Sequence, residues 1–315
     1  MRTRRILAAA ITSGVIALAG CASDDLSKDP TSDGKGDGAG GGTAVSISGQ
    51  NFPEGELVAQ MYAQLLTAHD YAPKVKLVGT RDVYMADFPE SIDVVPEYVG
   101  GVVEFLNTTK NGAEAKPLTT SGAEQSIQAA QSLLEDKGIV LLDPSEAADA
   151  NAFFVTQEYA DAEGVSTLSD MKGKSVTLAA MPDCEQRIDC GAGLKDVYGI
   201  TIEKILPLGY GTDQVYKSVL DDESQMGLTA TTDGTLESQG LVLLEDDQKI
   251  QPAQNLVPAV SQEFLQAHPE VEKPLNDLMA ALTTEKLTEL NGRVAVDREK
   301  AEDVAKEFLQ DEGLI

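Results

Sequence analysis

Short apolar runs alternate along the chain with longer segments of helical spacing. The run at residues 92–95 predicts a buried strand, and Pro96 is expected to end its hydrogen-bond ladder. A helical repeat follows at residues 102–105, so Tyr98 lies where a strand gives way to a helix. In an open α/β sheet the carboxyl ends of strands border the ligand crevice. Tyr98 is therefore a candidate to face a ligand, and a tyrosine of the core is the alternative.

The same pattern predicts the other elements of the chain. Strands are expected at residues 45–47, 75–78, 139–142, 151–155, 175–178, 225–229 and 241–244. Helices are expected at residues 57–66, 123–136, 193–198 and 214–220, and from residue 261 onward. Two more helices are expected, one after the turn at residue 79 and one that starts near residue 167. Residues 106–120 are polar and are expected to form a loop. Alternating strands and helices favour mostly parallel sheets.

The first 21 residues are typical of a secretory leader. Three arginines lie among residues 2–5, residues 6–18 are apolar, and small residues precede Cys21. The sequence LAGC at residues 18–21 resembles a bacterial lipobox, which implies cleavage before Cys21 and lipidation of its sulfur. An uncleaved membrane helix is the alternative, but the apolar segment is shorter than the roughly 20 residues that a span needs.

Residues 24–43 are rich in Gly, Asp, Ser and Lys, which predicts a disordered tether. The glycines at residues 36–41 match GxGxxG, but no strand precedes them and no helix follows. A dinucleotide site is therefore excluded, and no cofactor is expected.

Composition and charge restrict the partners of the chain. It has 315 residues, 42% of them apolar, which is enough to bury one or two cores. The net charge is −28, and removal of the three leader arginines lowers it by three to −31. So acidic a chain is not expected to bind nucleic acid or anionic lipid through its surface field. The charge is a solubility property and does not by itself indicate a cationic substrate.

Two cysteines remain once Cys21 is assigned to lipidation. Cys184 and Cys190 form a pair in a compartment that permits disulfides, so we expect a structural disulfide, with two free thiols as the alternative. Their spacing is not CxxC and no histidine is near them, so no zinc site is expected.

An enzyme would need a nucleophile with a base, a metal cluster or a phosphate-binding loop. His69 and His268 are the only histidines, and both are expected at the surface. The sequence contains no GxSxG, HExxH or P-loop motif. We therefore expect no catalytic residues and no enzymatic activity.

Five stretches of sequence, in one order, carry a resemblance to a known family. They are SISGQNFPEGELVAQMYAQLL, IDVVPEYVGG, NAFFVTQEYA with TLSDM, CEQRIDCGAGLKDVYGI, and TTDGTLESQGLVLLEDDQKIQP. Together they resemble the substrate-binding proteins of ABC importers for glycine betaine, choline, carnitine and related quaternary amines. The resemblance implies a two-lobed α/β fold of the type II periplasmic binding proteins, in which each lobe is a mostly parallel sheet flanked by helices and two crossover hinge strands join the lobes.

The resemblance also implies an organisation for the chain. The expected parts are a lipoprotein signal peptide at 1–20, the lipidated cysteine and tether at 21–43, the first lobe at 44–149 and 251–315, and the second lobe at 150–250.

In such a family, two lobes close on a small cationic or zwitterionic ligand and then dock on membrane permease subunits. The resemblance implies a monomer on the extracytoplasmic face of the cell membrane, held there by its lipid alone. Two alternatives stay open. One is the same clamp for a bulkier zwitterion such as an amino-acid betaine, and the other is a lipid-anchored sensor or interaction protein without a transport role.

A quaternary ammonium group is attracted mainly by aromatic faces and negative charge. The family usually supplies tyrosines at four places. Tyr98 matches the first of these and Phe153 the second, with Phe154 as an alternative equivalent. Ala230 and Ala253 stand where the other two tyrosines are expected. Either other rings such as that of Tyr210 replace them, or the ligand is not a compact betaine.

Arg187 matches the family arginine that pairs with the carboxylate of a ligand, and its planar fork suits such a contact. The alternative is a structural ion pair with Asp189 or Glu185. Gln50 stands where the family often has lysine, and Gly101 replaces a threonine that can donate a hydrogen bond.

Other polar residues near expected strand ends complete the candidate ligand-binding set. Asn51 lies in the turn after the first strand, where a helix start can bind a carboxylate, or where Asn51 simply caps the helix. Arg81 lies in the next such turn and is a candidate partner for a carboxylate, with a solvated position as the alternative. Thr232, Asp233 and Asn255 are expected near the cleft, where Asp233 would offset a cationic group or cap a helix.

Overall fold

The structure is a computed structural model that describes residues 42–315. The expected signal peptide, the lipidated Cys21, the GxGxxG match and nearly all of the tether lie outside the described residues.

The described chain folds into strands, helices and four short 3₁₀ turns. The strands are β1 (Thr43–Gln50), β2 (Tyr71–Val78), β3 (Val94–Tyr98), β4 (Ile139–Leu141), β5 (Asn151–Thr156), β6 (Ser175–Ala180), β7 (Thr201–Pro207), β8 (Met226–Ala230), β9 (Leu241–Leu244) and β10 (Leu256–Ser261). The helices are α1 (Pro53–Ala68), α2 (Arg81–Met85), α3 (Val99–Asn111), α4 (Ala123–Ala129), α5 (Gln131–Lys137), α6 (Gln157–Glu163), α7 (Gly191–Asp196), α8 (Asp213–Leu220), α9 (Gln262–Ala267), α10 (Glu272–Ala281), α11 (Thr284–Ala295) and α12 (Ala301–Asp311). The 3₁₀ turns are Ser169–Met171, Cys184–Gln186, Glu237–Gln239 and Pro269–Val271.

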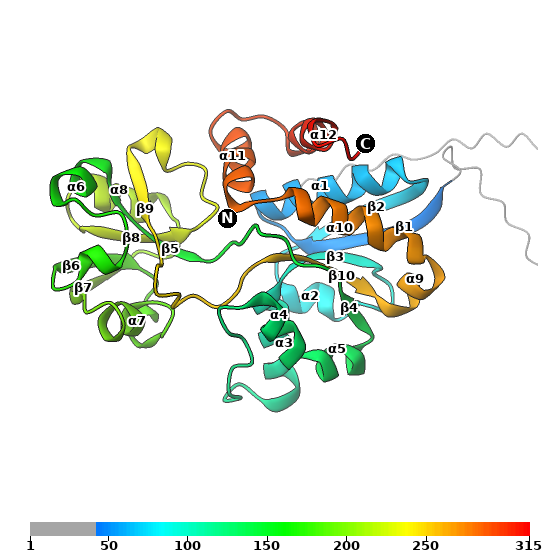
Figure 1. Ribbon diagram of the computed structural model, residues 1–315, viewed down its shortest axis with the longest axis horizontal. Coiled ribbons are helices and arrows are strands. Elements are labelled where there is room, and N and C mark those ends of the chain that lie inside the picture. The colour runs from blue at the N-terminus through cyan, green and yellow to red at the C-terminus, as the bar shows by residue number, and fades with distance from the viewer. Residues whose placement is uncertain (1–41) are drawn as a thin grey trace, which may run out of the picture. The chain divides into compact units, whose positions relative to one another are not determined.

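The first sheet has the order β2-β1-β3-β10-β4. β1 is parallel to β2 and β3, whereas β10 is antiparallel to both β3 and β4. Successive side chains of a strand point to opposite faces, so Val94 and Val95 enter separate buried clusters. Helices α1, α10 and α12 pack on the face of Val94, and α2, α3 and α5 pack on the face of Val95 (Figure 1).

The second sheet has the order β7-β6-β8-β5-β9. β6 is parallel to β7 and β8, and β5 is antiparallel to β8 and β9. Phe153 and Phe154 on β5 point into different clusters, one formed with α6 and α7 and the other with α8. The predicted class of two mostly parallel sheets flanked by helices is confirmed.

Two connections join the sheets. The chain leaves β4 through residues 142–150 to enter β5, and it leaves β9 through residues 245–255 to enter β10. The connections meet at an antiparallel bridge between Ala148 and Asn255. The first sheet is thus built from two separate parts of the chain, and the exact lobe boundaries stay predictions.

The expectation that Pro96 ends its strand is wrong. Pro96 lies inside β3, directly opposite Pro258 of β10. A proline removes one N–H donor. β1 is in register with β3 only at Ile47 and Val94, and β3 continues past the proline by pairing with β10 on its other side.

Other differences involve polar segments whose structure depends on distant contacts. The expected loop at 106–120 is helical as far as Asn111, because Asn107 is buried and its amide donates to Glu104 and to the Lys116 carbonyl oxygen. The single helix expected at 123–136 is interrupted at Ala130. Strands β7 and β10 were not expected, because β7 is a mostly exposed edge strand and β10 contains a proline.

We expect Gly227→Ala to destabilise the protein by about 1–3 kcal/mol, the usual cost of overfilling a core. A Cβ at Gly227 on β8 would collide with the ring of Phe154, which is fully buried. Urea denaturation measures the effect. In the matched control Gly79→Ala, the new Cβ meets no atom within 4 Å. Equal stability of the two variants would contradict this account of the second core.

Candidate functional site

A cavity of about 240 Å³ is lined by residues from β8 of the second sheet, from α8, from α1 and α11, and from the segments beside them. Its aromatic residues are Phe52, Tyr210 and Tyr216, its acidic residues are Glu54, Asp149 and Asp233, and Thr229, Ala230, Thr232, Thr235 and Asn291 are among the rest. The acidic and aromatic residues lie at the start of α1, on the connection before β5, on and before α8, and just after β8. Aromatic rings together with negative charge suit a cation.

Glu54 links several elements of this cavity. Its Oε1 accepts a hydrogen bond from the Tyr98 hydroxyl at 2.5 Å, and its Oε2 accepts one from Asn291 Nδ2 of α11 at 2.6 Å. The Asn291 amide also donates to the backbone oxygen of Thr232, just after β8, at 2.9 Å. Glu54 and Asn291 therefore join α1, β3 and α11 to the segment that follows β8.

Asp149 is the carboxylate with the most perturbed acidity. Burial raises its pKa to about 7, and the charges of Glu54 and Asp233 act in the same direction. The hydrogen bond that Oδ1 accepts from Thr232 Oγ1, at 3.2 Å, opposes the shift. Near neutral pH, Asp149 therefore exchanges between its protonated and ionised forms.

Asp233 has a full set of hydrogen bonds. Its Oδ2 accepts from the Tyr216 hydroxyl and from Thr229 Oγ1, both at 2.6 Å. Its Oδ1 accepts from the backbone N–H of Thr235 at 3.0 Å and from its hydroxyl at 2.7 Å. These bonds keep the carboxylate and the Tyr216 ring in fixed positions at the cavity wall.

Burial raises the pKa of Tyr98 and of Tyr210 above the ordinary tyrosine value, and nearby carboxylates raise both further. Both rings are therefore neutral near pH 7. Tyr98 and Gln50 line a small separate hollow of about 10 Å³ next to Phe52, whose ring centroid is 6.4 Å from that of Tyr98. Tyr98 thus reaches the larger cavity through its bond to Glu54.

The other expected cage positions do not come together. Phe153 and Phe154 are both buried in the cores on either face of the second sheet, and neither lines the cavity. Ala253 is buried elsewhere and its carbonyl oxygen accepts from the N–H of Gly100. Only Ala230 lies in the cavity wall, where its methyl group leaves space that a tyrosine would fill.

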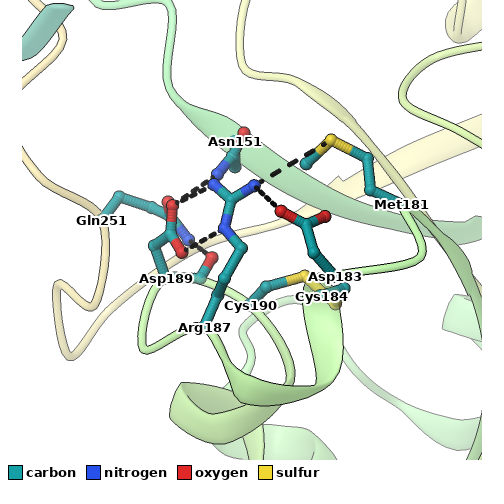
Figure 2. A network of polar contacts seen from close by, with 8 residues as sticks. All are labelled: Asn151, Met181, Asp183, Cys184, Arg187, Asp189, Cys190 and Gln251. Carbon is teal, nitrogen blue, oxygen red and sulfur yellow. Dashed lines mark hydrogen bonds and ion pairs between the residues drawn. A yellow bond between two sulfur atoms is a disulfide. The ribbon is translucent and has the colours of Figure 1, made fainter. Parts of the chain in front are cut away.

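Arg187 forms ion pairs with neighbouring acids (Figure 2). Its Nε and Nη2 donate to the two carboxylate oxygens of Asp189 at 2.9 and 2.6 Å, and Nη1 lies 3.6 Å from Asp183 Oδ2. The hydrogen bond to Asp189 raises the pKa of Arg187 above its ordinary value. Arg187 is not among the residues that line the cavity. Its contact with a ligand carboxylate stays a prediction.

The loop that carries Arg187 is held in several ways. A disulfide joins Cys184 and Cys190 (Figure 2). Asn151 Nδ2 donates to Asp189 Oδ2 at 3.0 Å, and Gln251 Nε2 donates to the Asp189 carbonyl oxygen at 2.9 Å. The loop is thereby attached to β5 and to the connection at residues 245–255 that leads from β9 to β10.

Arg81 forms an ion pair with Glu97, whose side chain is only 1% exposed. Its Nε and Nη2 donate to the two oxygens of Glu97 at 2.9 and 3.0 Å, and Glu97 also accepts from the Tyr84 hydroxyl and from the backbone N–H of Tyr98. A Cβ at Gly101 would collide with the Arg81 guanidinium. Glycine in place of the family threonine therefore gives this ion pair its space.

The polar candidates divide into two groups. Thr232 and Asp233 line the cavity, as described above. Asn51 is exposed, and the N-cap of α1 is Phe52, without a side-chain cap. Asn255 lies at the end of the connection from β9 to β10, where its amide donates to the Ser145 carbonyl oxygen at 2.9 Å.

Sequence reasoning missed Glu54, Asp149, Tyr216 and Asn291. The position of Glu54, at the start of the helix that follows the first strand, could have identified it, because ligand crevices lie at the carboxyl ends of strands. Asp149 directly precedes the expected crossover into the second lobe, and this position could have identified it as a residue near the cleft. Nothing in the helical patterns of α8 and α11 distinguishes Tyr216 or Asn291 from other surface residues.

The described chain gives no sign of a metal centre or of a membrane-spanning helix. Within residues 42–315, no three His, Cys, Asp or Glu side chains are grouped as metal ligands would be. None of the helices in that range is both long enough and apolar enough to cross a bilayer.

Comparison with known sequences identifies a family. Residues 43–311 match the family described as the substrate binding domain of ABC-type glycine betaine transport systems. The glycine betaine-binding protein YehZ of Escherichia coli K12 is 26% identical over 282 residues, which cover 85% of this chain and 90% of that protein. The carnitine transport binding protein OpuCC of Listeria monocytogenes is 25% identical over 274 residues, which cover 84% of this chain and 86% of that protein.

Solved structures give the same fold. A glycine betaine/carnitine/choline ABC transporter structure has a TM-score of 0.73 at 20% identity and covers 87% of this chain and 99% of its own. Apo YehZ from E. coli has a TM-score of 0.71 at 24% identity, and the match covers 86% of this chain and 99% of the YehZ chain. The predicted type II periplasmic-binding-protein fold is confirmed.

We expect Asp149 to make stability depend on pH. Its pKa is raised in the folded protein to about 7 from an ordinary value near 4, so its contribution to stability is lost as the pH rises through that window. The stability of Asp149→Asn relative to the unmodified protein should therefore increase by about 1–3 kcal/mol from pH 5 to pH 8. Urea denaturation at both pH values measures this. The exposed Asp136→Asn should give no such change, and a pH-independent difference for Asp149→Asn would refute the assignment.

Proposed function

The chain belongs to the family of substrate-binding domains of ABC-type glycine betaine transport systems, and from this premise we propose that its cavity captures a quaternary amine or a related small cation or zwitterion. The observation that carries the proposal is one cavity with three aromatic rings and three carboxylates but no lysine or arginine among its lining residues. Within residues 42–315, this is the arrangement that best fits an amine cation.

The mechanism follows from the two connections between the sheets. Residues 142–150 and 245–255 would act as a hinge, so that the elements on either side close on the ligand. Closure removes water from the cavity, and the lower dielectric strengthens the attraction between the carboxylates and the cation. The closed form would then dock on the permease subunits of an importer, with transport driven by a separate ATPase.

Further features of the protein are part of the same proposal. We propose that Cys21 carries a lipid that anchors a monomer to the extracytoplasmic face of the bacterial cell membrane. The disulfide between Cys184 and Cys190 would persist there, because that compartment is oxidising. The family acts in transport and is not a family of enzymes.

A bulkier zwitterion, such as an amino-acid betaine, is a second candidate. The small side chain of Ala230 in the cavity wall leaves room for a larger ligand. A relative at 24% identity over 238 residues, from Helicobacter pylori, is named an ergothioneine transport permease/ergothioneine binding protein, and the match covers 75% of this chain but 41% of that protein. Ergothioneine therefore belongs in any ligand panel, beside choline, glycine betaine and carnitine.

We expect Tyr210→Ala to weaken binding of the panel ligand that binds most tightly. Tyr210 is 37% exposed in the cavity wall, and loss of one ring facing a cation should cost about 0.5–2 kcal/mol, or roughly 2- to 30-fold in Kd. Isothermal titration calorimetry measures the change. Tyr210→Phe keeps the ring and serves as the control. Unchanged affinity in Tyr210→Ala would remove the cavity from consideration as the ligand site.

Arg187→Ala separates the two interpretations of Arg187. Because its guanidinium is bonded to Asp189 and Asp183 outside the cavity lining, we expect the variant to bind choline and glycine betaine within about twofold of the unmodified protein. Parallel titrations of the two ligands measure this. A loss of about tenfold for glycine betaine alone, near 1.4 kcal/mol, would instead support a contact with the ligand carboxylate.

A further inference from the structure

We propose that Asn291 and Gly292 of α11, together with Gly234, are positioning residues for ligand binding, because their contact holds the two sides of the cavity at the separation that a ligand needs. The inference rests on the proposed function, since it takes this cavity as the solute site. It adds a non-covalent connection between the two sheets to the chain connections at residues 142–150 and 245–255.

Helix α11 is fixed to the core of the first sheet. Leu287 and Leu290 are buried in the same cluster as Ile47 of β1. The start of the helix is also held, because Thr284 Oγ1 accepts a hydrogen bond from the backbone N–H of Ala148 at 3.2 Å. α11 therefore belongs to the body that is built around the first sheet.

A second face of α11 contacts the segment that directly follows β8 of the second sheet. Asn291 Nδ2 donates to the Thr232 carbonyl oxygen at 2.9 Å. Gly292 and Gly234 pack backbone against backbone, and a Cβ at Gly234 would collide with the backbone nitrogen of Gly292 and with the Thr288 carbonyl oxygen. This close approach therefore requires glycine at residue 234.

The contact is local and lies beside the proposed hinge. The backbone N–H of Thr231 donates to the Ala150 carbonyl oxygen at 2.9 Å, and Thr231 Oγ1 accepts from the Ala150 N–H at 3.0 Å. α11 and β9 together line an open groove of about 1180 Å³. Because the contact is next to the hinge, a small separation there moves the far ends of the two sheets by a larger distance.

The same contact fixes residues of the cavity wall. Asn291 Nδ2 also donates to Glu54 Oε2 at 2.6 Å, so one amide group joins α1 to the backbone after β8. Thr232 Oγ1 in turn donates to Asp149 Oδ1 at 3.2 Å, and all four residues line the cavity. A ligand thus meets walls that are already in place, which reduces the cost of ordering them. Loss of the contact makes this conformation less populated, and the apparent Kd rises in proportion.

Two alanine variants separate the contact surfaces without removing a side chain. In Gly292→Ala, the new Cβ lies 3.1 Å from the Gly234 carbonyl oxygen, which forces a small shift, and Gly292 is not among the residues that line the cavity. In Gly234→Ala, the collision is with backbone and the shift is larger. Alanine favours a helix interior over glycine, so Gly292→Ala is not expected to unfold α11.

Isothermal titration calorimetry with choline and glycine betaine measures the effect on binding. We expect Kd to rise about threefold in Gly292→Ala and at least about tenfold in Gly234→Ala, as overpacking of a close contact predicts, and by the same factor for both ligands. Asn291→Ala should likewise weaken both ligands equally. Gly79→Ala, whose Cβ meets no atom within 4 Å, is the matched control without effect.

The radius of gyration, from small-angle X-ray scattering, distinguishes positioning from a purely structural role. Without ligand, Gly234→Ala should have a larger radius of gyration than the unmodified protein, and saturating choline should remove the difference. A role in stability alone would lower the melting temperature and leave the radius of gyration unchanged.

The remaining outcomes overturn the inference. Unchanged binding in Gly234→Ala would show that the contact does not position the cavity, and tighter binding would show that it opposes the ligand-binding conformation. Loss of one ligand only, or weaker binding at an unchanged radius of gyration, would place the effect in the cavity wall itself. In each of these cases the unmodified protein still binds its ligand, whereas no binding of choline, glycine betaine, carnitine or ergothioneine by the unmodified protein would overturn the proposed function.

Discussion

The hydrogen bonds of Glu54 connect elements that border the cavity of the candidate site. The carboxylate lies in the first turn of α1, where the positive end of the helix dipole favours a negative charge by about 0.3–1 kcal/mol. Tyr98 donates to it from the end of β3, and Asn291 donates to it from α11. Because Asn291 also holds the Thr232 backbone after β8, the position of this one buried carboxylate is coupled to elements of both sheets.

The same contacts lie next to the proposed hinge. The two connections between the sheets are bonded to each other at the bridge between Ala148 and Asn255 and by the backbone N–H of Asp149, which donates to the Gln254 carbonyl oxygen at 3.0 Å. Asp149 is the neighbour of Ala148 in the chain and lies in the cavity wall. Under the proposed function, a cation bound beside Glu54 and Asp149 would contact both α1 and the connection at residues 142–150.

Much of the fold was predictable from the sequence, and less of the site was. The strand at β3, the helix after it and the position of Tyr98 between them follow from local patterns of apolar residues. Strand β10 does not, because a proline in its centre hides a pairing that depends on β3 and β4. For the site, Thr232 and Asp233 were found because they follow a strand. Asn291 was not, since its role depends on a contact with Glu54 that lies 237 residues away in the chain.

The arginines illustrate why chemical type alone does not identify the partner of a side chain. Arg81 and Arg187 have the fork geometry that binds a carboxylate, and both do bind one, but the partners are Glu97 and Asp189 of the same chain. With 52 acidic residues against 24 lysines and arginines, a guanidinium in this chain has many acidic partners to compete for it. The reverse holds for the acids, which outnumber the available cations. Glu54 is buried and Asp149 is half-buried, and both lie where no lysine or arginine lines the cavity wall.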